Sequence, residues 1–215
     1  MDGLIEIPMF PLGNPFMPTE DLPLRIFEGR YIQMFGDLTR SDLDVAPVFG
    51  SVMIERGKEV GGGDKRAQFG VLAEIRGIKW SPSGDRAMVV ATVTDLLEVV
   101  EWLPEIPYPR AVVEVTRCEA ARTDGPFAIA YAQAATTVRQ LRALAFELGA
   151  PIDPTVLVGD TSDDATESGW RLCAQAPLDE LDRYQLIRLR DNTDRMQALD
   201  ALCQQRLDTY KFGLS

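Results

Sequence analysis

The chain has 215 residues, which suffices for one large domain or two small ones with a sizeable core. Its 33 acidic residues outnumber its 22 basic ones, so the net charge is −11, and both residues 1–118 and residues 119–215 are acidic, which argues against binding to nucleic-acid phosphates. No apolar run reaches the roughly 18 residues that would cross a bilayer, and the acidic start and three scattered cysteines (Cys118, Cys173 and Cys203) predict a cytoplasmic protein with free thiols.

The first predicted elements alternate short apolar runs with prolines. Pro8 and Pro11 each lack a backbone donor, so residues 7–13 are expected to form an edge strand followed by an ordered turn. A second extended segment over residues 22–26 precedes a helix whose first turn includes Glu28. The apolar face of this helix is predicted from residues at helical spacing, which are Phe27, Tyr31, Met34, Phe35 and Leu38.

Four further strands are predicted next, with turn-forming residues between them. Residues 56–66 are a glycine-rich connection, residues 81–85 have the composition of a tight turn, and residues 102–109 are too rich in proline for regular structure. The stretch 86–100 reads as one long strand or as two shorter ones. The regular spacing indicates an all-β sandwich or barrel. The strands are expected over residues 45–54, 68–80, 86–100 and 111–118.

From residue 126 onwards the apolar residues recur with a helical period. A helix is predicted over residues 127–148, ending at Gly149. Residues 151–169 are expected to form a loop with a short helix near residues 153–157. The inward face of the long helix is predicted to carry Val138, Leu141, Leu144, Ala145 and Leu148. The loop is expected to carry an acidic tip made of Asp160, Asp163, Asp164 and Glu167.

Three more helices are predicted towards the end of the chain. One begins at Trp170, one covers residues 178–189, and the last covers residues 193–210 with Asn192 as its N-cap. The inward residues of the last helix are predicted to be Met196, Leu199, Leu202, Cys203 and Tyr210.

The order of residues 7–31 resembles the opening of the LON substrate-binding domain, which is the N-terminal domain of the ATP-dependent Lon proteases. Weaker matches continue through residues 49–52, 70–75, 107–111 and 176–195, while residues 91–96 depart from the family pattern. The matching residues at the start are Pro8, Phe10, Pro11, Leu12, Gly13, Pro18, Leu22, Pro23, Leu24, Ile26, Phe27, Glu28, Arg30 and Tyr31.

The resemblance implies a free-standing LON substrate-binding domain without the ATPase and protease domains of Lon. The implied fold is α+β, with an N-terminal PUA-like β-barrel lobe carrying one helix over residues 1–118 and a C-terminal α-helical lobe over residues 119–215. The implied structural motif consists of Phe10, Pro11, Leu12, Phe27, Glu28, Arg30 and Tyr31. In this family Glu28 and Arg30 read as structural charges rather than as catalytic groups.

The implied function is a non-catalytic module that binds unfolded or partner polypeptides, as an adaptor in protein quality control. Its negative charge favours basic, apolar segments. Candidate peptide-binding residues are Phe16, Met17, Trp102 and Tyr108, for which packing in the core is the simpler interpretation. The alternative is a regulatory module that binds a small molecule in a pocket between the two lobes. No nucleic acid or membrane partner is expected, and a homodimer is left open.

Known catalytic and metal-binding patterns are missing from the sequence. There is no histidine, which removes the commonest general base and metal ligand. Gly57 and Lys58 are followed by Glu59 rather than by the hydroxyl residue of a P-loop. Residues 123–128 resemble the stretch around the catalytic serine of Lon proteases, but Phe127 stands at the position of the nucleophile. We therefore expect no catalytic residue, metal or cofactor, and a hydrolase ranks last among the candidate functions.

Overall fold

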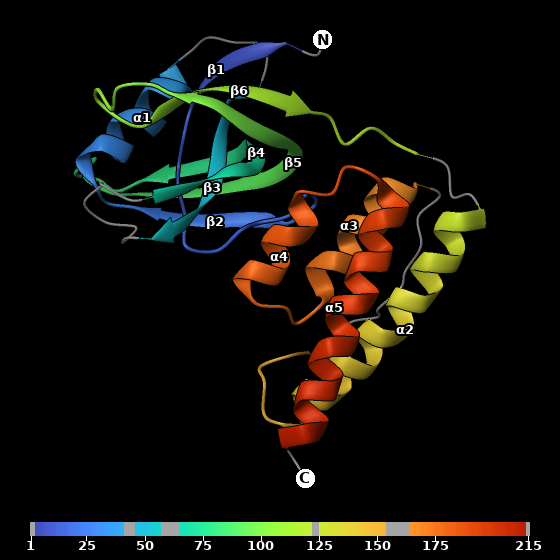
Figure 1. Ribbon diagram of the computed structural model, residues 1–215. Coiled ribbons are helices and arrows are strands. Elements are labelled where there is room, and N and C mark those ends of the chain that lie inside the picture. The colour runs from blue at the N-terminus through green and yellow to red at the C-terminus, as the bar shows by residue number, and fades with distance from the viewer. Residues whose placement is uncertain (1–2, 41–45, 57–64, 122–124, 154–163, 214–215) are drawn as a thin grey trace. The chain divides into compact units, whose positions relative to one another are not determined.

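The computed structural model describes residues 3–40, 46–56, 65–121, 125–153 and 164–213 of the chain (Figure 1). The chain divides into two compact units, which we call the β unit (residues 1–118) and the helical unit (residues 119–215). The combination of an antiparallel sheet and helices makes the fold α+β, as predicted. Within the described parts of the chain, every helix is too short or too polar to cross a membrane.

The described residues of the β unit form one six-stranded antiparallel sheet and one helix (Figure 1). The strand order is β1-β6-β5-β4-β3, and β2 pairs with the first half of β5. Residues 86–100, which were predicted to form either one strand or two, correspond to the single strand β5. The elements are β1 (Leu4–Pro8), β2 (Asp21–Ile26), α1 (Gly29–Arg40), β3 (Val48–Arg56), β4 (Lys65–Trp80), β5 (Ala87–Trp102) and β6 (Arg110–Thr116).

The sheet is not closed, so the predicted PUA-like barrel is not confirmed. Residues 9–12, which follow β1, run beside β3 and make two isolated parallel bridges to it. The Phe10 N–H donates to the Gly50 carbonyl (2.8 Å), and the Leu12 N–H donates to the Val52 carbonyl (3.0 Å). Pro11 lies between these two donors, where the alternation of an extended segment turns its nitrogen away from β3, so its missing N–H costs no bond to that strand.

An aromatic cluster anchors α1 to the sheet. Phe10 lies against Tyr31 with ring centroids 4.4 Å apart, and Phe35 meets Phe49 edge-on at 5.3 Å. Both contacts have the tilted geometry that aromatic pairs prefer. The motif at the start of the chain therefore builds the core of the β unit.

The start of α1 differs from the prediction. The helix begins at Gly29, and the Glu28 carbonyl accepts its first hydrogen bond from the Ile32 N–H (2.9 Å). Glu28 is thus the N-cap residue and not part of the first turn. Because β2 continues to Ile26, whose side chain points inward, strand alternation turns Phe27 outward, where it is 60% exposed. The predicted place of Phe27 on the buried helix face is wrong.

The helical unit is built around α2 and α5, which pack along each other (Figure 1). Its elements are α2 (Gly125–Glu147), α3 (Ala165–Gln175), α4 (Glu180–Ile187) and α5 (Asn192–Gly213). The helix predicted over residues 127–148 is α2, which begins two residues earlier, at Gly125. Leu148 follows the end of α2 and is exposed, contrary to the prediction, because the helix ends one residue before it.

Two aspartates cap the starts of α3 and α5, at positions that differ from the predicted ones. Asp164 accepts from the Thr166 N–H (2.9 Å), so α3 begins five residues before Trp170. Asp191, rather than Asn192, caps α5 by accepting from the Asp194 N–H (2.9 Å). The predicted short helix near residues 153–157, together with Asp160 and Asp163 of the acidic tip, falls almost entirely in residues 154–163, outside the described residues.

A buried arginine connects α3, α4 and α5. Arg195 is 1% exposed, and its guanidinium carbon lies 3.7 Å from the ring centroid of Trp170. It donates to the carbonyl of Leu189 (2.7 Å) and to Oδ1 of Asn192 (2.7 Å). One side chain therefore fixes the connection between α4 and α5 against α3.

The three cysteines differ in accessibility, which gives a first prediction. Cys173 and Cys203 are buried, while Cys118 is partly exposed. Burial raises the pKa of Cys203 to about 12, and the charges of neighbouring groups such as Asp200 add to this. We expect iodoacetamide at about pH 8 to modify only Cys118 in the native protein, because the thiolate is the reactive form. Mass spectrometry of tryptic peptides measures this, with the urea-unfolded chain as the control in which all three react. Rapid native modification of Cys203 would contradict the structure.

A second prediction concerns the turn that leads into β2. Residues 17–20 form a tight turn in which the Glu20 N–H donates to the Met17 carbonyl (3.1 Å), and Thr19 has a φ of 76°. A β-branched residue is strained in this region, so Thr19→Gly is expected to raise the free energy of unfolding by about 1 kcal/mol. The matched control is Thr136→Gly in α2, which should lower it by about 0.3–0.5 kcal/mol, since the glycine there gains no relief of strain. Urea unfolding measures both, and a destabilised Thr19→Gly protein would refute the expectation.

Candidate functional site

β2, β5 and β4 share a sheet face that points away from the core. The register places Arg25 of β2 opposite Met88 of β5, which in turn lies opposite Lys79 of β4. The next row is Pro23, Val90 and Gly77. All six residues are exposed, although Met88 and Val90 are large and apolar. We call these residues the outer ladder: Pro23, Arg25, Gly77, Lys79, Met88 and Val90.

The outer ladder lacks a side chain at one position. The register of β4 shifts between Ile75 and Gly77, and this irregularity brings Gly77 to the outer side opposite Val90. A Cβ atom added to Gly77 would meet no other atom within 4 Å. Val90 therefore faces a residue without a side chain on its β4 side.

A cavity of about 630 Å³ adjoins this face at the end of β2. It lies between the end of β2 and the hairpin that joins β4 to β5. Phe27 is 60% exposed and Met88 is 48% exposed at the cavity, so apolar surface is available to a ligand. The cavity is lined by Arg25, Ile26, Phe27, Lys79, Trp80, Ser81, Pro82, Arg86, Ala87 and Met88.

The hairpin that forms one wall of the cavity is ordered by its own hydrogen bonds. The Ser81 N–H donates to the Arg86 carbonyl (2.9 Å), and the Ser81 hydroxyl donates to Oδ1 of Asp85 (2.9 Å). Gly84 supplies the positive φ of 72° that the turn requires. Hydrogen bonds from Ser83 and then Ser81 lower the pKa of Asp85, with Arg86 adding to the effect. The predicted turn over residues 81–85 is confirmed.

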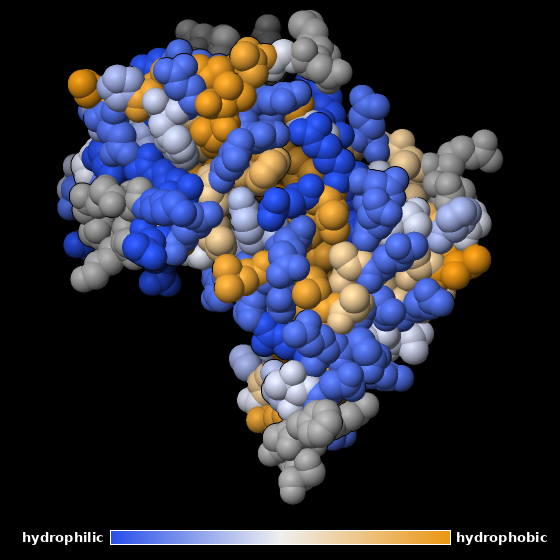
Figure 2. Space-filling model, viewed as in Figure 1, coloured by the Kyte–Doolittle hydropathy of each residue, from blue (hydrophilic) through white to orange (hydrophobic). Residues whose placement is uncertain are grey.

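The charge around the cavity differs from that of the whole chain. Arg25, Lys79 and Arg86 line it, and no aspartate or glutamate does. Among the described residues none of these three cations forms a salt bridge. Most other described cations of the β unit do pair with carboxylates, namely Arg30, Arg40, Lys65, Arg66, Arg76 and Arg110. Figure 2 shows how the molecular surface alternates between hydrophilic and smaller apolar patches.

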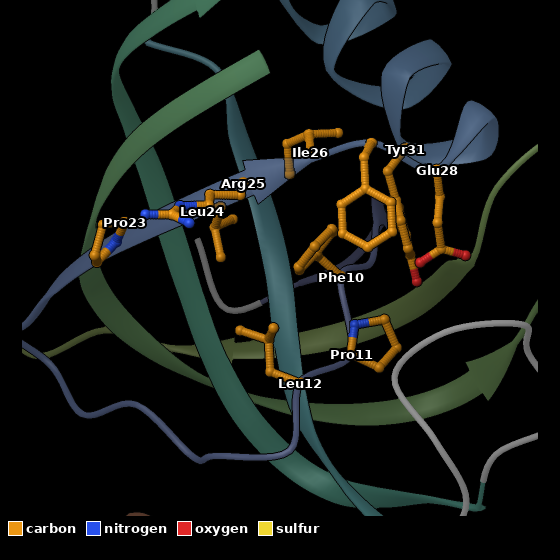
Figure 3. Close-up of a pocket in the computed structure, with 10 residues that line it drawn as sticks. Phe10, Pro11, Leu12, Pro23, Leu24, Arg25, Ile26, Glu28 and Tyr31 are labelled. Carbon is orange, nitrogen blue, oxygen red and sulfur yellow. The ribbon is translucent and has the colours of Figure 1, made fainter. Parts of the chain in front are cut away.

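A second pocket, of about 170 Å³, is built from the motif at the start of the chain (Figure 3). Arg25, Ile26 and Phe27 line both cavities, so the end of β2 separates them. In Figure 3, Glu28 and Tyr31 reach this pocket from the start of α1. Its remaining lining residues are Phe10, Pro11, Leu12, Pro23 and Leu24.

Glu28 and Arg30 belong to an ion-pair network. Arg30 lies 3.2 Å from the Glu28 carboxylate and 3.6 Å from that of Glu105. Its guanidinium carbon also lies 4.6 Å from the ring centroid of Tyr31. Glu105 pairs in addition with Arg66. These contacts give both motif charges partners within the β unit.

The four predicted peptide-binding residues do not form one surface. Met17 is fully buried, so it presents no side chain to a ligand. Phe16 and Tyr108 pack against the core beside α1, where the Tyr108 hydroxyl donates to Oδ2 of Asp37 (3.3 Å). Trp102 packs against a different cluster of the core. None of the four lines either cavity.

Comparison with protein families decides the assignment of the chain. The model of the ATP-dependent protease La (LON) substrate-binding domain matches residues 6–208. The chain belongs to this family. No curated protein matches the chain. Among the described residues of this LON domain, no group of three or more histidine, cysteine, aspartate or glutamate side chains is placed to hold a metal ion.

Solved structures of LON domains share the fold. The crystal structure of a Lon N-terminal domain protein from Xanthomonas campestris is 21% identical with a TM-score of 0.65, over 92% of this chain and 98% of that one. The N-terminal domain of the Lon protease from Mycobacterium avium complex is 15% identical with a TM-score of 0.61, over 93% of this chain and 98% of that one. At these identities the comparison supports the fold alone.

Proposed function

We propose that this LON domain is a non-catalytic module that binds unfolded polypeptide segments on the outer ladder and in the adjoining cavity. The observation that carries the proposal is the concentration of exposed apolar side chains around a cavity of about 630 Å³ in a member of the substrate-binding family. Phe27, Met88 and Val90 supply the apolar contact area. As an adaptor, the module would hold such segments for other components of protein quality control.

The contact is made by side chains rather than by addition of a strand to the sheet. The Val93 N–H donates to the Glu20 carbonyl (2.9 Å), which places even-numbered residues of β2 in the hydrogen-bonded pairs with β5. The backbone of Pro23 therefore faces the free edge of β2, where proline has no N–H to donate. An extended segment laid across the outer ladder instead places its apolar side chains beside Val90 and in the cavity.

The chemistry of the cavity favours binding over catalysis. Ser81 is the only hydroxyl in the lining, and it donates its hydrogen bond to Asp85. The lowered pKa of Asp85 makes this carboxylate a weak base, so it is poorly suited to activate the hydroxyl. The lining offers no thiol or carboxylate as a further nucleophile or base.

Binding of an unfolded probe tests the proposal. A fluorescent, reduced and alkylated model protein should bind the wild-type domain, and its folded form should not. The double variant Phe27→Ser/Met88→Ser is expected to weaken binding about tenfold, because two exposed apolar side chains leave the contact. The matched control is Ile129→Ser, which removes a 64% exposed apolar residue from the helical unit and should leave binding unchanged. Equal binding of folded and unfolded probes would refute the proposal.

A small molecule is the second candidate ligand, because the cavity has a volume typical of small-molecule sites. The polypeptide is favoured since the apolar surface continues beyond the cavity along β5 to Val90. Probes of different length distinguish the small molecule from the polypeptide as the ligand. A single N-acetylated, amidated phenylalanine should bind far more weakly than a peptide that contains it. Equal affinity would favour the small molecule.

A further inference from the structure

The cavity combines apolar walls with cations that have no salt-bridge partner among the described residues. We propose that the segments bound there are acidic as well as apolar, with an aspartate or glutamate next to an aromatic or large aliphatic residue. This inference rests on the proposed function and names the substrate class of the same site. It is opposite to the preference for basic segments that the net charge of −11 predicts.

The cations stand on three sides of the apolar part of the cavity. Arg25 and Lys79 flank Met88 on the two neighbouring strands, and the spacing of strands separates their backbones by about 10 Å. Arg86 lies at the start of β5, at the end of the hairpin. An apolar side chain that enters near Met88 thus brings the residues beside it close to a positive charge. Carboxylates there gain charge-assisted hydrogen bonds.

The charges inside the cavity affect a bound segment more than the net charge of the whole chain does. The field of distant carboxylates is screened within about 8 Å at physiological ionic strength, so the groups in the cavity decide which segment fits. Two carboxylates belong to segments beside the cavity. Glu28 is paired with Arg30 at 3.2 Å, whereas Asp85 accepts hydrogen bonds from Ser81 and Ser83 and keeps a negative charge that interacts with Arg86. The positive charge that remains available to a ligand is therefore mainly that of Arg25 and Lys79.

Among the described residues, the opposite end of the outer face carries no unpaired cation. Glu74 pairs with Arg76 at 2.6 Å, and the Asp21 carboxylate, which accepts from the Thr92 hydroxyl at 3.0 Å, keeps its negative charge. The unpaired positive charge of this face therefore lies at the end with the cavity. A bound segment should place its acidic residues at that end and its neutral apolar residues along Val90.

Three short peptides test the inference directly. They are acetylated and amidated, share two phenylalanines, and carry aspartate, glutamine or lysine beside each phenylalanine. Fluorescence anisotropy should show the aspartate peptide binding about tenfold more tightly than the glutamine peptide, and the lysine peptide binding most weakly. The preference for aspartate should shrink at high salt. A non-amidated glutamine peptide shows whether a terminal carboxylate is an equal ligand, which would contradict recognition of the acidic side chain.

Reversing the charge of cavity residues tests whether the preference for the aspartate peptide arises in the cavity. The variant Arg25→Glu/Lys79→Glu should weaken the aspartate peptide about tenfold and strengthen the lysine peptide. The controls are Arg117→Glu, an exposed cation of the β unit outside the cavity, and the thermal unfolding curve of each variant. Reversal of Arg117 should leave the order of the peptides unchanged.

Each outcome separates the inference from the function on which it rests. If none of the peptides binds, the proposed function itself fails. If all three bind equally, or if the lysine peptide binds best, the domain binds polypeptides but the preference for acidic segments is wrong. If the aspartate peptide binds best and the cavity variant does not change this, the acidic preference belongs to another surface.

Discussion

Replacing Arg195 with alanine is expected to lower the free energy of unfolding of the helical unit by about 3–4 kcal/mol. The change leaves the carbonyl of Leu189 and Oδ1 of Asn192 without their buried donor, and it removes the guanidinium from the face of Trp170. Partly buried acceptors that lose a donor keep much of the cost of their desolvation. Arg195→Lys should recover only part of the loss, because an ammonium group cannot reproduce the planar fork of donors.

The unfolding of the helical unit can be measured through the reactivity of a buried thiol. Cys203 is buried in α5, so its alkylation at increasing urea concentration follows the opening of this unit. The control is Arg139→Ala, an exposed arginine on α2 whose loss should change the midpoint little. A midpoint of Arg195→Ala equal to that of Arg139→Ala would show that the buried guanidinium contributes nothing.

Replacing Gly70 with alanine is expected to destabilise the β unit by about 2–4 kcal/mol. Gly70 lies opposite Val52, and an added Cβ would stand 2.2 Å from the carbonyl oxygen of Ser51 and 2.7 Å from Cγ1 of Val52. The nearest atom belongs to the backbone, so β3 and β4 must move apart to admit the methyl group.

Gly77 of the same strand provides the matched control. Its added Cβ meets no atom within 4 Å, and its φ is not positive, so Gly77→Ala should be neutral or slightly stabilising. Urea unfolding monitored by circular dichroism compares the two variants. If they unfold at the same midpoint, the close approach of β3 and β4 at Gly70 does not exist in solution.

Local sequence patterns predicted most elements of this fold, since their causes are local. Apolar runs between turn residues predicted strands over residues 68–80 and 86–100, which correspond to β4 and β5, and the helical period from residue 126 predicted α2. One error arose where two nearby residues can serve the same purpose. Asn192 and Asp191 are both good N-caps, and only the geometry of the preceding residues selects Asp191.

The candidate site was not predicted, because its residues come from segments far apart in the sequence. Arg25 and Lys79 meet Met88 only through the strand register, and the irregularity beside Gly77 sets which residues of β4 face outward. A signal was nevertheless present. The strict alternation of β2 assigns Pro23 and Arg25 to the outer face, and the same reasoning applied to β5 assigns Met88 and Val90 there, where apolar residues are costly unless a partner covers them.

Proline at the free edge of β2 has a consequence for colloidal behaviour. A protein that binds partly unfolded chains can itself be added to a growing fibril if one of its edge strands exposes unpaired backbone N–H and C=O groups. Pro23 interrupts the row of amide hydrogens on which such growth depends. If the domain binds unfolded chains as proposed, those chains would find no β-strand template along this edge.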